Sequence, residues 1–278
     1  MRETPAKVNL VLEVGALRPQ DGRHELRTLF VPFHGVTDSL EVTPNPPGTG
    51  ITLALTGRAI PGGESPEKNL ACRALSEYCR AAAIAPDFHL ALHKRIPICA
   101  GLGGGSSDAA ATLLEINELQ RNQHGTALPP LRLHEIARSL GADVPFFLTP
   151  VPSLATGIGD LLTPVPQMAI PHLRVLYPGT PSPVAWAYQH WHRRPNTTPP
   201  PWPPAPDHDW NDGGLWNDLE PAVEETHPEI TRAKHALLQA GATHTLLSGS
   251  GSAILAVFPT KDACENAHVV MENHWELY

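Results

Sequence analysis

Cysteine is scarce in this sequence, and long apolar runs are missing from it. Only four cysteines occur in 278 residues, and no two of them form a Cys-x-x-Cys pair, which excludes the usual redox and zinc-binding motifs. The first residues, Met-Arg-Glu-Thr-Pro, lack the apolar stretch of a signal peptide, and no segment is apolar over the length that a membrane span needs. We therefore expect a cytoplasmic protein with no membrane contact.

Basic residues are also few. There are 20 Lys+Arg against 28 Asp+Glu, for a formal net charge of -8, and no basic run occurs. This argues against a large surface for nucleic acid or anionic membrane and favours a small-molecule partner. The 15 histidines include no His-Glu-x-x-His motif and no pair beside a cluster of carboxylates or thiolates, so no metal-ligating residues are assigned. Both a monomer and a homodimer fit these features.

Residues 6–14 alternate between two faces, as a strand does. One face carries the apolar side chains Ala6, Val8, Leu10, Leu12 and Val14. The other face carries Lys7, Asn9, Val11 and Glu13. The pattern predicts a strand with a polar side, on which Lys7 and Asn9 point the same way.

The rest of the chain mixes strands and helices. Strands are predicted at residues 36–44, 51–56, 88–93 and 173–177, and helices at 69–83, 107–121 and 132–140. The tail predicts a helix at 228–240, strands at 245–247 and 253–258, and a helix at 261–273. Residues 194–209 are crowded with prolines and are expected to form an irregular loop, an insertion or a lid. The fold class is α+β, with two domains at 1–155 and 156–278.

The most informative segment is a glycine loop followed by an Ala/Leu-rich helix. Gly101, Gly103, Gly104 and Gly105 let the backbone bend tightly, and the helix that starts near Ser106 adds unpaired N–H groups and a positive dipole end. This combination predicts a phosphate site.

Two familiar nucleotide motifs do not fit this loop. A Walker loop needs a later Gly followed by Lys and Ser/Thr, but Ser106 and Ser107 stand there. A dinucleotide fingerprint needs Gly at position 106 and an acidic residue after a second strand, and residues 118–125 are not strand-like. On these residues alone, a flexible loop that caps an ordinary helix stays an alternative.

Three motifs in a fixed order carry a resemblance. They are Pro5-Ala-Lys-Val-Asn-Leu10, the segment 97–107 with its helix, and Leu247-Ser-Gly-Ser-Gly-Ser-Ala253. This arrangement resembles the GHMP small-molecule kinase superfamily. The resemblance implies an N-terminal lobe like ribosomal protein S5 and a ferredoxin-like C-terminal lobe.

Further motifs resemble one branch of that superfamily. They are residues 21–30, Gly141-Ala-Asp-Val-Pro-Phe146 and Asn217-Asp-Leu-Glu-Pro221. This branch uses ATP to phosphorylate the 2-hydroxyl of 4-diphosphocytidyl-2-C-methyl-D-erythritol in the non-mevalonate isoprenoid pathway. The resemblance therefore implies a transferase that needs ATP and Mg²⁺ and acts on a cytidine-diphosphate-linked alcohol.

The resemblance also implies the catalytic and ATP-binding residues. Asp143 is the base for the substrate hydroxyl and Lys7 the cation beside it, although a helix-capping Asp143 and a solvated Lys7 are the ordinary alternatives. The ATP site comprises Asn69, Lys94, Pro97, Ile98, Cys99, Ala100, Gly101, Leu102, Gly103, Gly104, Gly105, Ser106 and Ser107. The Ser106 or Ser107 hydroxyl serves phosphate or Mg²⁺. Asn69 could equally be the N-cap of its helix.

The substrate side holds one departure from the branch. Its members usually have Gly-Tyr-His, where this chain has Gly22-Arg23-His24. His24 keeps a hydrogen-bonding role toward cytosine, and Arg23 either stacks on the base or is a solvated charge. The other predicted substrate residues are Asn9, Trp186, Tyr188, Ser248, Gly249, Ser250 and Gly251. For the last four, a simple hairpin turn is the alternative.

Two other functions stay open. One is a GHMP kinase for a different alcohol, such as homoserine or mevalonate. Such a kinase would not need the cytidine-binding segment 21–30. The other is a noncatalytic regulator that binds nucleotide on the same fold. The presence of both Lys7 and Asp143 argues against the regulator.

Overall fold

The computed structural model describes residues 1–58, 65–192 and 197–278. These residues form two units, one of residues 1–6, 36–98 and 103–150 and the other of residues 7–35, 99–102 and 151–278. The units interleave along the sequence because β1 (Arg2–Leu17) and β2 (His24–Pro44) each contribute residues to both. A division at residue 155 does not coincide with these units, and the domain boundary stays a prediction.

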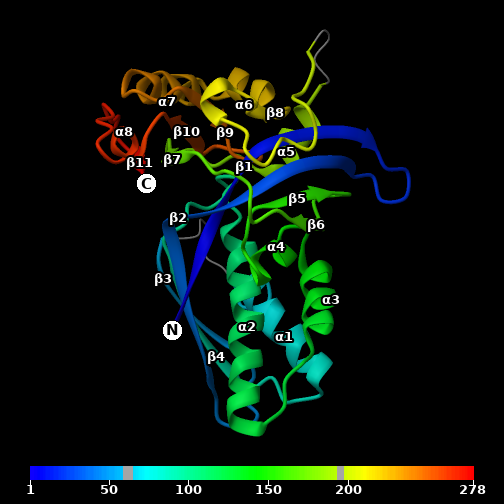
Figure 1. Ribbon diagram of the computed structural model, residues 1–278. Helices are drawn as coiled ribbons and strands as arrows, with labels where there is room; N and C mark the ends of the chain where they lie inside the picture. Colours follow the sequence, from blue (N-terminus) through cyan, green and yellow to red (C-terminus); the bar gives the residue numbers. More distant parts are fainter. Residues whose placement is uncertain (59–64, 193–196) are drawn as a thin grey trace. The chain divides into compact units, whose positions relative to one another are not determined.

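The first unit combines strands with a group of helices. β4 (Phe88–Lys94) lies between β2, to which it is antiparallel, and β3 (Thr52–Gly57), to which it is parallel. The helices are α1 (Leu70–Ala82), α2 (Gly104–His124), α3 (Pro130–Leu140) and α4 (Val144–Leu148). Figure 1 shows α1, α2 and α3 grouped on one side of β3 and β4. Parallel strands need such a crossover, and α1 supplies it between β3 and β4.

Helix α1 illustrates why the first unit holds together. The Asn69 side chain accepts hydrogen bonds from the N–H groups of Ala71 and Cys72, which starts the helix. Its apolar face is fully buried, and the buried Tyr78 hydroxyl donates to Asn117 Oδ1 on α2 at 2.7 Å. The hydrogen bond satisfies two polar groups that burial would otherwise leave unpaired.

The second unit contains the β1–β2 hairpin and a separate antiparallel sheet. β8 (Trp216–Asn217) pairs in parallel with β1, and β5 (Ser153–Thr156) pairs with β2 and with β6 (Leu161–Pro164). The separate sheet has the order β11-β7-β10-β9, with β7 at His172–Tyr177, β9 at His244–Leu247, β10 at Ile254–Phe258 and β11 at Glu276–Leu277.

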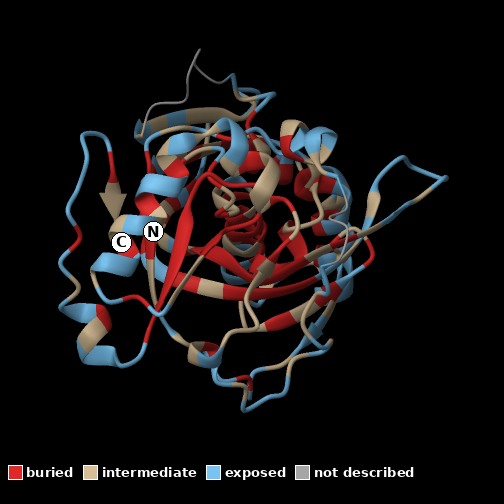
Figure 2. Ribbon diagram, turned by 90° about the horizontal axis from the view of Figure 1, so that it is seen from above, coloured by how far each residue is buried: buried red, intermediate tan, exposed pale blue. Residues whose placement is uncertain are grey.

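Short helices complete the second unit. They are α5 (Val184–His190), α6 (Glu220–Thr226), α7 (Pro228–Gln239), α8 (Lys261–Glu265) and a 3-10 turn at Trp210–Asp212. Helix α7 packs against β9 and β10. Every residue of β10 is buried, and Figure 2 shows the buried residues concentrated on the strands and the inner helix faces.

Most predicted elements are confirmed, and the α+β class holds. The helix predicted at 261–273 is wrong beyond Glu265. Asn266 closes the helix by donating from its backbone and its side chain to the Asp262 carbonyl, and β-branched Val269 and Val270 follow. The strand predicted at 36–44 covers only the second part of β2, and the prediction also missed the short elements β5, β6, β8, β11, α4, α5 and α6. Of the predicted proline-rich loop, residues 194–196 lie outside the described residues, and residues 197–209 form no helix or strand.

Candidate functional site

Lys7 and Asn9 lie side by side on β1, as the alternation predicted. The Lys7 ammonium donates to Asn9 Oδ1 at 2.7 Å, and Asn9 Nδ2 donates to Thr28 Oγ1 at 2.7 Å. Thr28 in turn donates to the Val11 carbonyl at 2.7 Å. This chain of bonds fixes the orientation of the Asn9 amide, with its oxygen toward the cation.

The polar side of β1 is not a solvent-facing side. Lys7 is only 5% exposed and Asn9 only 2%, so the alternative of a solvated Lys7 is wrong. The Lys7 ammonium also lies 5.1 Å from the centre of the Phe30 ring, within the range of a cation–π contact. A buried ammonium needs such partners because burial removes its hydration.

Two glycine segments approach this lysine within the second unit. A Cβ on Gly249 would lie 3.3 Å from both Lys7 Nζ and Asn9 Oδ1 and 3.1 Å from the Gly101 carbonyl oxygen. A Cβ on Gly101, whose φ is +75°, would lie 1.9 Å from the Ser248 carbonyl oxygen. Both positions therefore require glycine. The Lys7 N–H donates to the Leu102 carbonyl at 2.9 Å, which ties the loop to β1.

In the first unit, α2 begins after Gly103, a residue with no side chain that could cap the helix. Gly103 is the N-cap of α2, with φ of 71° and no side-chain cap bond among the described residues. Gly105 is exposed and Ser106 is half-buried. Binding of an anion by the first N–H groups of α2 stays a prediction.

Ser107 does not match its predicted use. Its side chain is fully buried, its hydroxyl donates to the Pro5 carbonyl at 2.6 Å, and it also bonds to the Thr4 hydroxyl. The hydroxyl is thus engaged inside the protein. The use of the Ser106 hydroxyl for phosphate or Mg²⁺ stays a prediction.

Lys94 belongs to a buried cluster that the sequence did not indicate. Its ammonium pairs with Asp38 and, at 2.5 Å, with Asp108 Oδ2. Asp38 Oδ1 also accepts from the N–H groups of Arg95 and Ile96. A Cβ on Gly104 would lie 2.9 Å from the Ile96 side chain and 3.3 Å from the Lys94 ammonium. The cluster thus lies against the first turn of α2.

The charged groups in this cluster shift each other's pKa values. Burial raises the pKa of Asp108 to about 8, against the opposing effect of Lys94 and with a further rise from Asp38. Burial lowers the pKa of Lys94, but the two carboxylates outweigh it and raise that pKa above its usual value. Asp108 Oδ1 is buried with no hydrogen-bond partner among the described residues. A proton on Asp108 would relieve the excess of buried negative charge.

Helix capping was the ordinary alternative for both Asn69 and Asp143, and the structure supports it only for Asn69. The Asn69 oxygen caps α1, as the alternative had it, and its role toward adenine stays a prediction. Asp143 is half-buried at the start of α4, and its side chain makes no cap bond to that described helix. Helix capping therefore does not explain Asp143.

An aromatic group surrounds His24 in the second unit. The Tyr188 ring is stacked with the His24 ring at a centroid distance of 6.2 Å, and the Trp191 ring meets it edge-on at 5.1 Å. His24 Nδ1 lies 3.0 Å from the Gly15 carbonyl oxygen. Because a carbonyl only accepts, Nδ1 carries the hydrogen, and Nε2 is the acceptor of the neutral ring.

Other predicted residues lie elsewhere in this region. Trp186 stacks on His190 at 4.2 Å instead of on His24. Arg23 is exposed, which agrees with the solvated alternative. The prediction missed Trp191, although the run Trp-Ala-Tyr-Gln-His-Trp at 186–191 is dense enough in aromatic residues to have suggested it.

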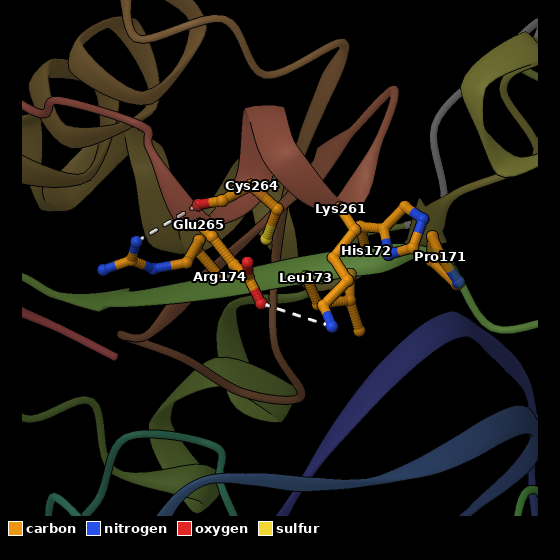
Figure 3. Close-up of a pocket in the computed structure, with 7 residues that line it drawn as sticks. All are labelled: Pro171, His172, Leu173, Arg174, Lys261, Cys264 and Glu265. Atoms are coloured by element: carbon orange, nitrogen blue, oxygen red, sulfur yellow. Dashed lines mark hydrogen bonds and ion pairs between the residues drawn. The ribbon is translucent and has the colours of Figure 1, made fainter.

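A separate hollow of about 500 Å³ lies beside β7 and α8 (Figure 3). Arg174 donates there to the carbonyl oxygens of Tyr278 and Cys264, and Lys261 lies 3.6 Å from Glu265. None of the residues predicted from the sequence lines it, and its cations already face partners.

Two further properties concern metals and membranes. In residues 1–58, 65–192 and 197–278, no three His, Cys, Asp or Glu side chains are grouped so that they could hold a metal ion. Across the same residues, no helix combines the length and apolar character required to cross a bilayer.

Comparison with known proteins agrees with the fold and the motifs. Residues 69–150 match the GHMP kinases N terminal domain, and residues 208–277 match the GHMP kinases C terminal domain. A homoserine kinase structure from Cytophaga hutchinsonii shares the fold with a TM-score of 0.67 at 19% identity. The chain therefore has the two-lobed fold of the GHMP kinases and is a small-molecule kinase.

Closer relatives define the family. The 4-diphosphocytidyl-2-C-methyl-D-erythritol kinase of Geobacter sulfurreducens is 37% identical over 97% of this chain and 93% of its own length. That of Citrifermentans bemidjiense is 38% identical over 95% and 91%. A crystal structure of 4-(cytidine 5'-diphospho)-2C-methyl-D-erythritol kinase has a TM-score of 0.73 at 36% identity, over 96% of this chain and 92% of that one. The chain belongs to the 4-diphosphocytidyl-2-C-methyl-D-erythritol kinase family.

The buried Lys94 cluster gives a pH-dependent prediction. Because folding raises the pKa of Asp108 to about 8, the folded state binds an additional proton between about pH 4 and pH 8, and stability falls as the pH rises through that window. Asp108→Asn removes this titration. Through Asp108, the free energy of unfolding of the wild type should fall by at most about 1.4 kcal/mol per pH unit. We expect this contribution to be absent from the variant. Urea denaturation at pH 5, 6, 7 and 8 measures it.

The exposed Asp207 provides the matched control, since Asp207→Asn removes a carboxylate from the surface. It should leave the wild-type slope in place. An equal slope in Asp108→Asn and wild type would show that Asp108 does not carry the pH dependence.

Proposed function

We propose that this chain transfers the terminal phosphoryl group of ATP to the 2-hydroxyl of 4-diphosphocytidyl-2-C-methyl-D-erythritol, a step of the non-mevalonate route to isoprenoid precursors. The observation that carries this proposal is the similarity to kinases of that name, at 36–38% identity over more than nine-tenths of the chain. The buried Lys7–Asn9 pair supports it from the structure, because an ammonium removed from water is suited to stabilising transferred charge.

The reaction needs little covalent chemistry from the protein. Phosphoryl transfer passes through a loose transition state, so the protein mainly positions the groups and neutralises charge. In our proposal Asp143 accepts the proton of the 2-hydroxyl, and the Lys7 ammonium stabilises the charge that develops. Asp143 is half-buried at the start of α4, which is compatible with this use.

ATP fits the loop and the start of α2. Gly103, the N-cap of α2, has no side chain to occupy the N–H groups that follow it. Phosphate oxygens can bind these N–H groups, and the positive end of the α2 dipole favours their charge. Mg²⁺ commonly binds through substrate phosphates and water with one or two protein ligands, so it needs no cluster of carboxylates. The Ser106 hydroxyl is the loop group that could join it, and the ion would neutralise phosphate charge.

We further propose that His24, Tyr188 and Trp191 hold the cytosine. In the neutral ring, His24 Nε2 accepts a hydrogen bond, which suits the exocyclic amino group of cytosine and not the carbonyl oxygen of uracil. Tyr188 and Trp191 offer aromatic faces beside it. They can supply aromatic stacking on the base.

The substrate preference tests the proposed function. ATP consumption should depend on the cytidylyl methylerythritol and should not occur at a comparable rate with homoserine or mevalonate. A coupled assay for ADP on the purified protein measures this. Equal turnover with mevalonate or homoserine and none with the cytidylyl compound would overturn the assignment.

The same assay examines the two catalytic residues. Lys7→Met and Asp143→Asn should each lower kcat by about a hundredfold or more, because one removes the stabilising charge and the other the base. The exposed Lys261 and Asp262 on α8 allow the same changes as controls, with kcat expected to stay at the wild-type value. Full activity in either test variant contradicts its assigned role.

Trp191 allows a test of base recognition. Trp191→Leu should raise KM for the cytidylyl substrate about tenfold, as expected from the loss of one base-stacking contact, with KM for ATP unchanged. Trp202→Leu, outside the His24 group, is the control. A cytidylyl KM equal to that of the wild type would exclude Trp191 from the base site.

A further inference from the structure

The motif Asn217-Asp-Leu-Glu-Pro221 has no role in the reaction described above, yet it holds the glycine hairpin at 248–252. Asn217 lies on β8, where it pairs with Leu12 of β1, and its side chain is only 3% exposed. Its Nδ2 donates to the carbonyl oxygens of Leu247 and Gly249, both at 2.7 Å. The hairpin is thus attached to the strand next to β1.

The remaining hydrogen-bonding capacity of Asn217 fixes its amide. Oδ1 accepts from the Leu219 N–H at 2.9 Å, so the oxygen is held away from the two carbonyl groups. An amide combines two N–H donors with an acceptor, whereas a carboxylate of the same shape offers acceptors alone when ionised. Asparagine therefore suits this position in a way that aspartate does not.

The rest of the motif anchors the same hairpin and the same strand. Glu220 Oε1 accepts from the Leu247 N–H at 3.0 Å and from the Lys234 ammonium at 2.7 Å. Asp218 Oδ2 accepts from the Val14 N–H at 2.8 Å. Both the N–H and the carbonyl of Leu247 are therefore held by side chains of one short segment, which is itself bonded to β1.

The hairpin in turn borders the Lys7–Asn9 pair. At Gly249, even a methyl group would lie 3.3 Å from the Lys7 ammonium and from Asn9 Oδ1. A shift of Gly249 toward β1 would therefore press on both polar groups. The position of the hairpin limits where the ammonium can lie.

We propose that Asn217 is a positioning residue: its amide fixes Gly249 beside the Lys7–Asn9 pair and thereby sets the place of the Lys7 ammonium. The inference rests on the catalytic role proposed for Lys7. Asn217 does not touch the substrate in this scheme and acts through the hairpin alone.

The main test replaces the amide by its charged counterpart. Asn217→Asp loses both donors and sets a carboxylate against two carbonyl oxygens, so Gly249 should move. Because a misplacement of about 1 Å can cost about a hundredfold in rate, we expect kcat to fall ten- to a hundredfold with KM for ATP unchanged. In the Lys7→Met background, the same change should lower kcat by less than twofold, since its effect passes through Lys7.

Two further variants separate positioning from a general loss of stability. Asn117 is another buried asparagine, and its Nδ2 donates to the Leu128 carbonyl, so Asn117→Asp makes the same change in α2. The Asn117→Asp variant should have a lower melting temperature. Its kcat, measured below that temperature, should equal the wild-type value. Gly249→Ala, which presses directly on the pair, should reproduce the kcat loss of Asn217→Asp.

A spectroscopic measurement keeps the inference testable whatever the substrate proves to be. In NMR spectra of protein with labelled lysine, the Lys7 side-chain resonance should shift in Asn217→Asp and stay in place in Asn117→Asp. An unmoved Lys7 resonance, or a kcat loss of equal size in the Lys7→Met background, contradicts the inference. Absence of turnover in the wild type contradicts the proposed function instead. In that case the NMR result alone tests whether Asn217 sets the position of the Lys7 ammonium.

Discussion

The buried ammonium of Lys7 is the constraint on which the second unit depends. A cation that is 5% exposed has lost its hydration and requires compensation from the protein. Asn9 provides an oxygen at 2.7 Å, and the face of Phe30 lies beneath the charge. The requirement extends from β1 to β2, because Thr28 on β2 accepts a hydrogen bond from the Asn9 amide and so orients it.

Close backbone approach follows from the same constraint. Gly101 and Gly249 both have positive φ, and each faces an atom that a side chain would strike or crowd. Gly249 brings the hairpin backbone next to the cation without a bulky side chain, and Gly101 lets the backbones of the loop and the hairpin approach each other. In the first unit, Gly104 has a comparable position against Lys94 and Ile96. Each unit thus places glycine next to a buried lysine ammonium.

Sequence reasoning predicted what local pattern and spacing determine. The alternation at residues 6–14 put Lys7 and Asn9 on one face, and the Asn69 cap and the glycine-rich start of α2 were likewise readable from neighbouring residues. Burial was not predictable in this way. The alternation marked the Lys7 face as polar, but contacts from Phe30 and Gly249, far along the chain, bury it.

The features that sequence reasoning did not predict also depend on contacts between residues far apart in the chain. Ser107 bonds to Thr4 and Pro5, and Lys94 pairs with Asp38, over separations of more than fifty residues. No local pattern reports such partners. The aromatic run at 186–191 could have suggested Trp191, but its contact with His24 became visible only in the structure. The motif at 217–221 was recognised by resemblance, but its hydrogen bonds to Leu247 and Gly249 became visible only in the structure.

The identity of the product tests the central claim most directly. Wild-type protein would be incubated with ATP, Mg²⁺ and 4-diphosphocytidyl-2-C-methyl-D-erythritol, and the mixture followed by phosphorus NMR. The account predicts a new phosphomonoester signal, assigned to the oxygen on C2 by its coupling to carbon, with one ADP formed per product molecule. Orthophosphate as the main product, or a phosphoryl group on another hydroxyl, would contradict it.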